Sequence, residues 1–310
     1  MKKIVIDIND SEQSIIKFLN KYLNKAPNSL LYKWLRTKKI KVNKKKAEPS
    51  LILHKGDIIN FYIYDEELEK WQEDVRNFKS KIDIDILYEN EDIIVFDKPQ
   101  NLLVHAASKE DYGKNVVDYM IDTLIARKEY IPRIEKTFRP ALINRIDRNT
   151  MGIVVGAKNR NALLKLNEQK TLINKYYLAI VEGKIDRPIK IENKLVKNDD
   201  NFVKVDAKGK KSITVINPIK FSEKYSLIEI ELITGRTHQI RASLKDIGHP
   251  IIGDRRYGNI KSNLFKDQQL VAYKIKFDNK IDLDSVKGLT IESKYKNNIE
   301  ILYKKLMREI

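Results

Sequence analysis

The strongest constraint on the architecture of this chain is an abrupt reversal of charge near residue 64. Residues 1–63 hold fourteen lysines and arginines against five acidic residues, whereas DEELEKWQED, residues 65–74, holds six acidic residues and one lysine. Such a shift in composition indicates a boundary between segments. We therefore expect a small basic domain over 1–64, a helical linker over 65–80 and a larger domain over 81–310, as a length of 310 residues suggests.

The basic segment has the apolar spacing of two helices followed by short strands with turns at Asn43 and Gly56. The inward-facing positions are Ile15, Phe18, Leu19 and Leu23 in SIIKFLNKYL, and Leu31, Trp34 and Leu35 in LLYKWLRTKK. The order of the helix pair, IKVNKK and PSLILHKGDII resembles the αL-motif RNA-binding domain first described in ribosomal small-subunit protein S-four. A solvated lysine face is the alternative. The expected RNA contacts are Lys33, Arg36, Lys38, Lys39, Lys41 and Asn43.

The composition limits the chemistry and the partners. A net charge of +17 indicates a polyanionic partner, most commonly nucleic acid, although a lysine-rich composition throughout accounts for part of it. The chain has no cysteine, and its four histidines do not cluster, so we expect no metal. The N-terminal sequence breaks its apolar run with acids, and no run is long enough to span a membrane. We expect a cytoplasmic monomer.

Glycine is scarce but unevenly placed. Six of the eleven glycines fall within residues 143–158 and 234–258. Glycine is needed where the backbone adopts unusual dihedral angles or approaches another group closely. These two windows are therefore the candidate functional sites.

The second window predicts a strand followed by a helix. Ile228, Ile230 and Leu232 alternate with glutamates, and the strand stops at Thr234-Gly235. Helical spacing then continues to Gly248, and Pro250 forbids its extension. Three potential cations, Arg236, His238 and Arg241, crowd the expected first turn, where the helix dipole favours anions. The pattern indicates a docked phosphate, a buried carboxylate, or a structural pairing with a distant acid.

Two further segments carry candidate side chains. In KYYLAIVEG, residues 175–183, Lys175 and Tyr177 share one face of a strand and Tyr176 lies on the other. A strand tyrosine usually packs in the core, but beside a cationic site it can stack on a base. In INRIDRNTMGIVVGAK, residues 143–158, Asp147 stands between Arg145 and Arg148. Taken alone, that stretch favours a surface ion pair.

Taken together, these motifs resemble the RluA/RluC/RluD-type family of RNA pseudouridine synthases, with the RluC-like branch favoured. The family pattern runs HRLDxxTSG, KxY and TGRxHQIRxH…GHPIxGDxxYG, and this chain has NRIDRNTMG, KYY and TGRTHQIRASLKDIGHPIIGDRRYG. ILYENEDIIVFDKPQNLLVH, residues 86–105, resembles the opening strand and turn of the family. The departures from the family pattern are Asn101, Asn144, Ile146, Met151 and Ala242-Ser243.

The resemblance implies an α+β catalytic domain with a mixed, largely antiparallel sheet flanked by helices. It implies an isomerase that turns uridine into pseudouridine, most commonly in 23S ribosomal RNA, without metal or cofactor. The implied catalytic residues are Asp147, its ion-pair partner Arg236, and Tyr177, which stacks on the uracil. Arg145 is the residue expected to fill the gap left by the flipped base, and the other implied substrate contacts are Lys175, His238, Gln239, Ile240 and Arg241.

Two other functions are alternatives to RNA pseudouridine synthesis. A non-catalytic RNA-binding or ribosome-assembly factor on the same scaffold would have lost Asp147, Tyr177 or Arg236, and all three are present. An RNA glycosidic-bond hydrolase would use the same carboxylate but would also need an activated water, for which the sequence offers no evident base.

Overall fold

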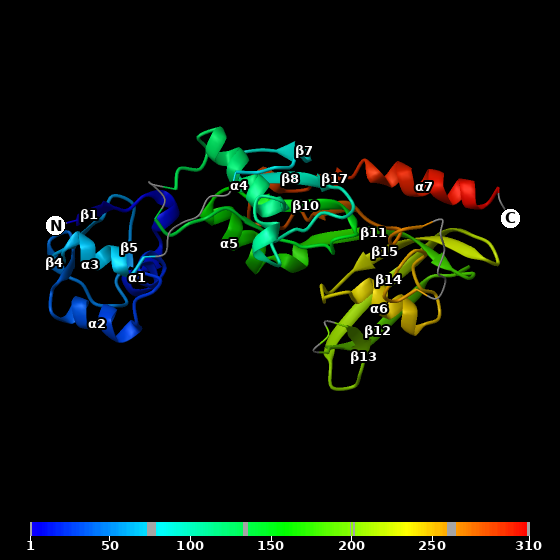
Figure 1. Ribbon diagram of the computed structural model, residues 1–310, viewed down its shortest axis with the longest axis horizontal. Helices are drawn as coiled ribbons and strands as arrows, with labels where there is room; N and C mark the ends of the chain where they lie inside the picture. Colours follow the sequence, from blue (N-terminus) through cyan, green and yellow to red (C-terminus); the bar gives the residue numbers. More distant parts are fainter. Residues whose placement is uncertain are drawn as a thin grey trace. The chain divides into compact units, whose positions relative to one another are not determined.

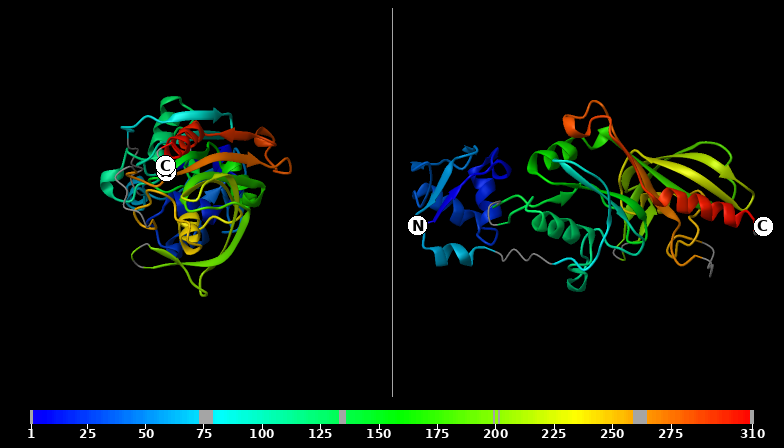
Figure 2. Two further views of the ribbon diagram at one scale, coloured as in Figure 1. Left: turned by 90° about the vertical axis from the view of Figure 1, so that its right-hand side faces the viewer. Right: turned by 90° about the horizontal axis from the view of Figure 1, so that it is seen from above.

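The computed structural model describes residues 2–72, 79–132, 136–198, 200, 202–258 and 265–308. The chain forms two compact units (Figures 1 and 2). The first comprises Met1–Lys79, Met120–Ala141 and Ala157–Leu163, and the second comprises Ser80–Tyr119, Leu142–Gly156 and Leu164–Ile310. Helices α4 (Val116–Ala126) and α5 (Arg160–Glu168) contribute residues to both units. The domain boundaries predicted at residues 64 and 80 stay predictions.

The first unit contains an antiparallel sheet, in the order β1-β6-β3-β4, and the two predicted helices. Helix α1 spans Ile15–Tyr22 and α2 spans Asn28–Arg36, and all the apolar positions predicted to face inward are buried in one cluster. A second small sheet pairs β2 with β5. The strands are β1 (Lys2–Val5), β2 (Gln13–Ser14), β3 (Ile40–Val42), β4 (Lys45–Lys46), β5 (Ile52–Leu53) and β6 (Ile58–Phe61).

The predicted turns of this unit are confirmed. Asn43 and Lys44 both have left-handed backbone angles, with φ of 49° and 63°, as a two-residue hairpin turn between β3 and β4 requires. Gly56 has φ of 91°. In the predicted linker, α3 (Asp65–Lys70) is helical and begins with three acidic residues, which complement the helix dipole. Residues 73–78 of the linker lie outside the described part of the chain.

The second unit is built on a mixed sheet in the order β13-β12-β14-β15-β11-β16-β10-β8-β7, with β17 paired to β16 and β9 to β10. The β10–β16 pair is parallel, whereas β12, β14, β15, β11 and β16 pair antiparallel in turn. The strands are β7 (Asp85–Glu89), β8 (Ile93–Lys98), β9 (Ala141–Leu142), β10 (Met151–Ala157), β11 (Ile173–Glu182), β12 (Ile189–Lys197), β13 (Val203–Val205), β14 (Lys210–Phe221), β15 (Tyr225–Leu232), β16 (Leu270–Phe277) and β17 (Thr290–Glu292).

Helix α7 (Tyr295–Leu306) covers one face of this sheet (Figure 1). Its Ile299 and Tyr303 pack in one cluster with Leu178 and Ile180 of β11. Because side chains alternate along a strand, Tyr177 lies on the other face, as predicted. The register of β11 against β16 shifts between Tyr176 and Tyr177.

The parallel pairing of β10 with β16 depends on a glycine. Gly152 lies opposite Ala272 with φ of 109°, and a Cβ atom at Gly152 would stand 2.2 Å from the Ala272 carbonyl oxygen. No side chain fits in that space. Gly152, a few residues after Asp147, thus has the role in close backbone approach that was predicted for the glycines of this window.

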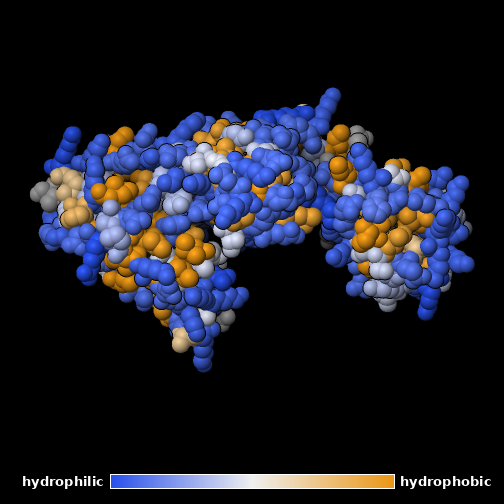
Figure 3. Space-filling view, turned by 180° about the vertical axis from the view of Figure 1, so that it is seen from behind, coloured by the Kyte–Doolittle hydropathy of each residue, from blue (hydrophilic) through white to orange (hydrophobic). Residues whose placement is uncertain are grey.

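The surface is in keeping with the charge of the chain. The face seen in Figure 3 is mostly hydrophilic, with separate apolar patches between hydrophilic residues. Within the described residues, no helix is both long enough and apolar enough to cross a membrane.

Candidate active site

Asp147 lies in the loop that joins β9 to β10. Its side chain is 29% exposed and lines a cleft of about 410 Å³. The same cleft is lined by residues 103–107, residues 145–149, His238, Arg241 and Gln268. Asp147 and Arg145 are thus brought together with the start of the predicted helix, as expected. Arg145 is exposed.

A carboxylate–arginine–carboxylate chain holds Asp147 in place. Arg241 donates from Nη1 to Oδ2 of Asp147 at 2.8 Å, and from Nε and Nη2 to the two carboxylate oxygens of Asp254 at 2.7 and 2.9 Å. The Asp254 side chain is fully buried and the Arg241 side chain is 10% exposed. Oδ1 of Asp147 has no hydrogen-bond partner among the described residues. One carboxylate oxygen is therefore anchored and the other is available to a ligand.

The charges of Asp147, Arg241 and Asp254 stabilise one another against the cost of burial. Burial lowers the pKa of Arg241, but its bonds to Asp254 and Asp147 raise it above the ordinary arginine value. Burial also raises the pKa of Asp254, but Arg241 and the backbone N–H groups of Arg256 and Tyr257 bring it below the usual range. Arg241 and Asp254 therefore both stay charged at neutral pH.

The prediction that Arg236 pairs with Asp147 is wrong. Helix α6 begins at Gln239 and ends at Asp246, so Arg236 precedes the helix instead of standing in its first turn. Arg236 is exposed, and its Nε donates to the carbonyl oxygen of Lys211 at 3.1 Å. Arg241, predicted only as a substrate contact, occupies the position that was expected for Arg236.

His238 caps α6 and connects it to a buried tyrosine. Its backbone is left-handed, with φ of 50°. Its Nδ1 lies 3.0 Å from the Tyr257 hydroxyl, which accepts a hydrogen bond from the Val203 N–H, and its Nε2 lies 3.8 Å from Oδ2 of Asp147. Which group donates in the bond between His238 and Tyr257 depends on the tautomer of the ring. Because the hydroxyl that accepts from Val203 still has its own proton, we propose that it donates to Nδ1, with the ring proton of neutral His238 on Nε2. Burial lowers the pKa of His238, and Arg241 and Arg256 act in the same direction against the attraction of Asp147.

Three other predicted residues, Tyr177, Ile240 and Lys175, lie outside the lining of the cleft. Tyr177 and Ile240 are buried, and the pKa of Tyr177 is raised by burial and by the nearby charge of Asp147. Lys175 is half-buried, and burial lowers its pKa, with Lys170 adding to the effect. Neither Tyr177, Ile240 nor Lys175 lines the cleft. The charge of Asp147 nonetheless reaches Tyr177.

Gln239 supports the site from inside the protein. Its Oε1 accepts from the Thr234 hydroxyl at 2.9 Å and from the Arg236 N–H at 3.0 Å. Its Nε2 donates to the Ile213 carbonyl and to the Thr214 hydroxyl. The amide is thus fully used in joining the 234–236 loop to β14, contrary to the prediction that it contacts substrate.

Two groups near Asp147, Lys98 and His105, were not predicted from the sequence. Lys98 is fully buried at the end of β8 and donates from Nζ to the carbonyl oxygens of Pro99, Leu102 and Arg148 at 2.8–2.9 Å. Burial lowers its pKa to about 7, against the attraction of Asp147. Burial also lowers the pKa of His105 in the cleft wall, helped by Arg145. Both lie in KPQNLLVH, residues 98–105, a segment that resembles the family but to whose residues no role was assigned.

The residues predicted to contact RNA through the basic domain all lie in the first unit. Lys33, Arg36, Lys38 and Lys39 are exposed, as predicted, and Lys33 and Arg36 line a hollow of about 360 Å³. The side chain of Asn43, by contrast, is engaged in its turn. It donates to Asp57 at 2.8 Å and accepts from the Ile58 N–H at 2.9 Å, so it stabilises the turn. Lys41 is half-buried, with its Nζ 4.9 Å from the centre of the Tyr62 ring.

Comparison with known proteins identifies relatives of this chain. The family model for RNA pseudouridylate synthase matches residues 92–246. A Mycoplasma capricolum protein named as an uncharacterized RNA pseudouridine synthase is 32% identical over 289 residues, covering 89% of this chain and 92% of that protein. The ribosomal large subunit pseudouridine synthase C of Escherichia coli (strain K12) is 33% identical over 272 residues, covering 84% and 80%.

Solved structures show the same fold. Human RNA pseudouridylate synthase domain containing 1 superimposes with a TM-score of 0.51 at 17% identity, covering 71% of this chain and 95% of that chain. Human RNA pseudouridylate synthase domain containing 4 gives 0.52 at 19% identity, covering 67% and 87%. The predicted mixed, largely antiparallel fold is confirmed. The chain therefore belongs to the RNA pseudouridylate synthase family, the isomerases that convert uridine in RNA to pseudouridine.

Proposed function

We propose that this enzyme modifies uridines of large-subunit ribosomal RNA and that Asp147 is its catalytic carboxylate. Relatives named ribosomal large subunit pseudouridine synthase C are 33–34% identical over more than four fifths of the chain in Escherichia coli and Vibrio parahaemolyticus. The net charge of +17 suits a large RNA. We further expect a cytoplasmic monomer.

One observation carries the assignment of Asp147. Its Oδ2 is anchored by Arg241 at 2.8 Å, whereas its Oδ1 has no partner among the described residues and stands in a cleft wide enough for a nucleoside. An ionised carboxylate held by one oxygen presents the other in a fixed direction, as nucleophilic or electrostatic catalysis requires. Arg241 itself is fixed by Asp254 and needs no rearrangement when substrate enters.

The isomerisation breaks the bond between N1 of uracil and C1′ of ribose, turns the ring, and joins C5 to C1′. The C5 proton leaves and N1 gains one, so the reaction needs neither a redox partner nor net water. Asp147 stabilises or captures the sugar–base junction while the bond is broken. The raised pKa of Tyr177 keeps its phenol neutral, so it contributes as an apolar ring and hydrogen-bonding group, not as a phenolate.

A uridine in stacked RNA reaches this cleft only after it is flipped out, at a cost of a few kcal/mol. Arg145 is exposed, two residues from Asp147, and lines the cleft. Its planar guanidinium can stack in the vacated space and bond to phosphate. The non-catalytic assembly factor is disfavoured, because such a protein has no need for a buried ion-pair chain that ends on one free carboxylate oxygen.

The test is release of tritium from transcripts labelled at uracil C5. We expect release from 23S transcripts and not from 16S or transfer RNA transcripts. Asp147→Asn should abolish release, whereas Asp246→Asn, an exposed aspartate at the end of α6, should not change it. Circular dichroism checks that both variants fold. Undiminished release by Asp147→Asn contradicts the role of Asp147, and preferential release from another RNA contradicts the substrate assignment.

A further inference from the structure

The isomerisation contains one proton transfer for which no residue has yet been named. Once C5 of the rotated uracil has joined C1′, the C5 proton must leave before the C5=C6 double bond can form again. The group that accepts this proton needs a lone pair, a position within the cleft and a pKa that leaves it unprotonated at the working pH.

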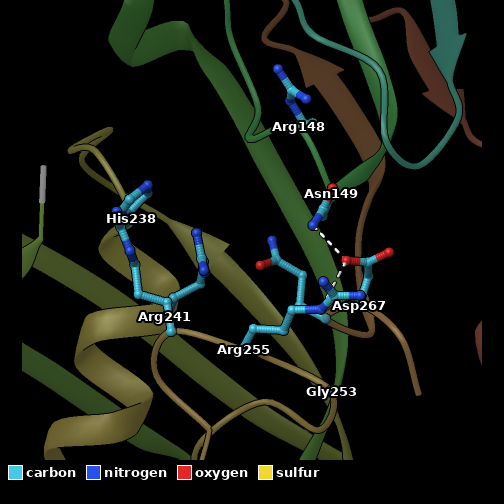
Figure 4. A pocket seen from close by; sticks show the side chains of 9 residues that line it. Arg148, Asn149, His238, Arg241, Gly253, Arg255 and Asp267 are labelled. Atoms are coloured by element: carbon cyan, nitrogen blue, oxygen red, sulfur yellow. Dashed lines mark hydrogen bonds and ion pairs between the residues drawn. The ribbon is translucent and has the colours of Figure 1, made fainter. Parts of the chain in front are cut away.

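Few side chains of the Asp147 cleft can accept that proton. Among the described residues that line it, the basic groups are the carboxylate of Asp147 and the imidazoles of His105 and His238. The arginines of the lining stay protonated, and its amides are not basic. Asp147 serves the sugar–base junction in the proposed function. His238 has its Nδ1 3.0 Å from the Tyr257 hydroxyl, and in the pocket drawn in Figure 4 it lies next to Arg241, whose charge opposes its protonation.

The ring of His105, by contrast, is free to meet a ligand. Neither of its ring nitrogens makes a hydrogen bond or ion pair with any described residue, and the residue is exposed, so solvent reaches it. Partial burial of the imidazole and the charge of Arg145 nonetheless lower its pKa, against the attraction of Asp118. The imidazole is therefore neutral at pH 7, with a proton on one nitrogen and a lone pair on the other.

Backbone hydrogen bonds hold the segment before His105 against the start of α4. The N–H groups of Val116 and Val117 donate to the carbonyl oxygens of Leu103 and Val104 at 3.0 and 3.2 Å. These N–H groups lie in the first turn of the helix and have no partner within it, so the segment satisfies them. His105 thus enters the cleft wall from a backbone whose position is set before RNA binds.

We propose that His105 is the base that removes the C5 proton of the rotated uracil. The proposal rests on the proposed function and assigns a second catalytic residue to it. The free ring nitrogen takes the proton, the electron pair of the C5–H bond forms the C5=C6 double bond, and the displaced C6=N1 pair takes a proton from water at N1. The imidazolium then releases its proton to solvent, so that tritium from C5 appears in the water.

The first test compares His105→Gln with His54→Gln, the same substitution at an exposed histidine of the first unit. Pseudouridine is measured by chromatography of digested 23S transcripts that were made with ordinary or 5-deuterated uridine. Glutamine keeps a donor and an acceptor but is not a base, so His105→Gln should lower the rate about 100-fold. It should also raise the deuterium isotope effect above that of the wild type and of His54→Gln, because C5 deprotonation becomes rate-limiting. Equal isotope effects in all three proteins, or an undiminished rate in His105→Gln, would overturn the proposal.

The second test supplies the base from solution. In His105→Ala, added imidazole should raise the rate about tenfold, whereas it should not restore Asp147→Asn. Circular dichroism checks that each variant folds. A failure of imidazole to raise the rate of His105→Ala contradicts the role of His105 as a base. His238→Gln enters the isotope comparison as well, and a raised isotope effect there, without one in His105→Gln, would assign the proton to His238.

The outcomes separate this proposal from the proposed function. A wild type that forms no pseudouridine in any RNA contradicts the function, and a fully active Asp147→Asn contradicts the role of that carboxylate. An active wild type with an unaffected His105→Gln contradicts the base alone.

Discussion

Asp254 fixes Arg241 through two parallel hydrogen bonds, 2.7 and 2.9 Å long, in a place where the carboxylate is fully buried. The arginine therefore reaches Asp147 with only Nη1, in a direction set before substrate arrives. Arg241 works as a rigid connection between a structural acid and the proposed catalytic one.

Replacing Arg241 should matter far more than replacing Arg236. We expect Arg241→Ala to lower tritium release about 10- to 100-fold, since hydrogen bonds to charged groups contribute roughly 1.5–3 kcal/mol. Arg236→Ala should change it by no more than about threefold, because its guanidinium is exposed and bonds to one carbonyl. Initial rates of tritium release, measured under the same conditions, compare the two variants. A larger loss of tritium release in Arg236→Ala than in Arg241→Ala would support Arg236 as the ion-pair partner of Asp147.

Asp254→Asn should destabilise the fold as well as the site. It leaves a buried guanidinium without its charged partner, a change that typically costs about 3–5 kcal/mol. The pKa of Asp254 is below its ordinary value in the folded protein, so this stabilisation is present above about pH 4 and is lost as the pH falls further. Urea unfolding at pH 7 and pH 3 measures both effects, with Asp246→Asn as control. A difference from wild type that is the same at both pH values would count against the ion pair.

His238 should stay neutral below its ordinary pKa. Its folded pKa is lowered, so the unfolded chain binds a proton first on acidification. The contribution of His238 to stability is therefore full above about pH 6.5 and declines as the pH falls through the folded pKa. Nitrogen-15 NMR of the ring should show the proton on Nε2. A proton on Nδ1 would mean that Tyr257 accepts from the ring, and the proposed direction of their bond would be reversed. His238→Gln identifies the resonance.

Lys98 should titrate near neutral pH. The pKa of about 7 means that the unfolded chain binds more protons than the folded one between roughly pH 7 and 10.5, so stability rises with pH across that window. Lys98→Met removes this dependence and leaves three carbonyl oxygens without a donor, at a cost of roughly 1–3 kcal/mol. Carbon-13 NMR of the lysine ε-carbons gives the midpoint.

Lys114→Met, at an exposed position of the second unit, is the control for Lys98→Met. A midpoint for Lys98 near the ordinary lysine value of about 10.4 would show that its three carbonyl partners outweigh burial.

Local patterns in the sequence were enough to predict the parts of the fold that depend on neighbouring residues. The buried faces of α1 and α2 follow from helical spacing, and the end of α6 follows from Gly248, which has φ of 82°, and Pro250. Asn101 takes a left-handed conformation, with φ of 61°, which asparagine adopts more readily than most residues. Each of these depends on residues a few positions apart in the chain.

The arrangement of the site depends on contacts that no local pattern contains. Asp147 and Arg241 are 94 residues apart, and which cation meets the carboxylate depends on where α6 begins. That start is set by the left-handed backbone of His238, a residue that carries no turn signal. Asn144, which stands where the family pattern has histidine, donates to the Ile153 carbonyl and accepts from the Val155 N–H. It fastens the Asp147 loop to β10, a role that the family motif did not indicate.

Gly152 has a consequence for genetics. Because even a methyl group there would collide with the Ala272 carbonyl, any replacement forces β10 and β16 apart and shifts the loop that carries Asp147. Null alleles recovered after random mutagenesis should therefore include position 152, although the position is buried and its residue has no side chain. Second-site suppressors of such alleles should map to the segment around Ala272, where the opposing strand can retreat.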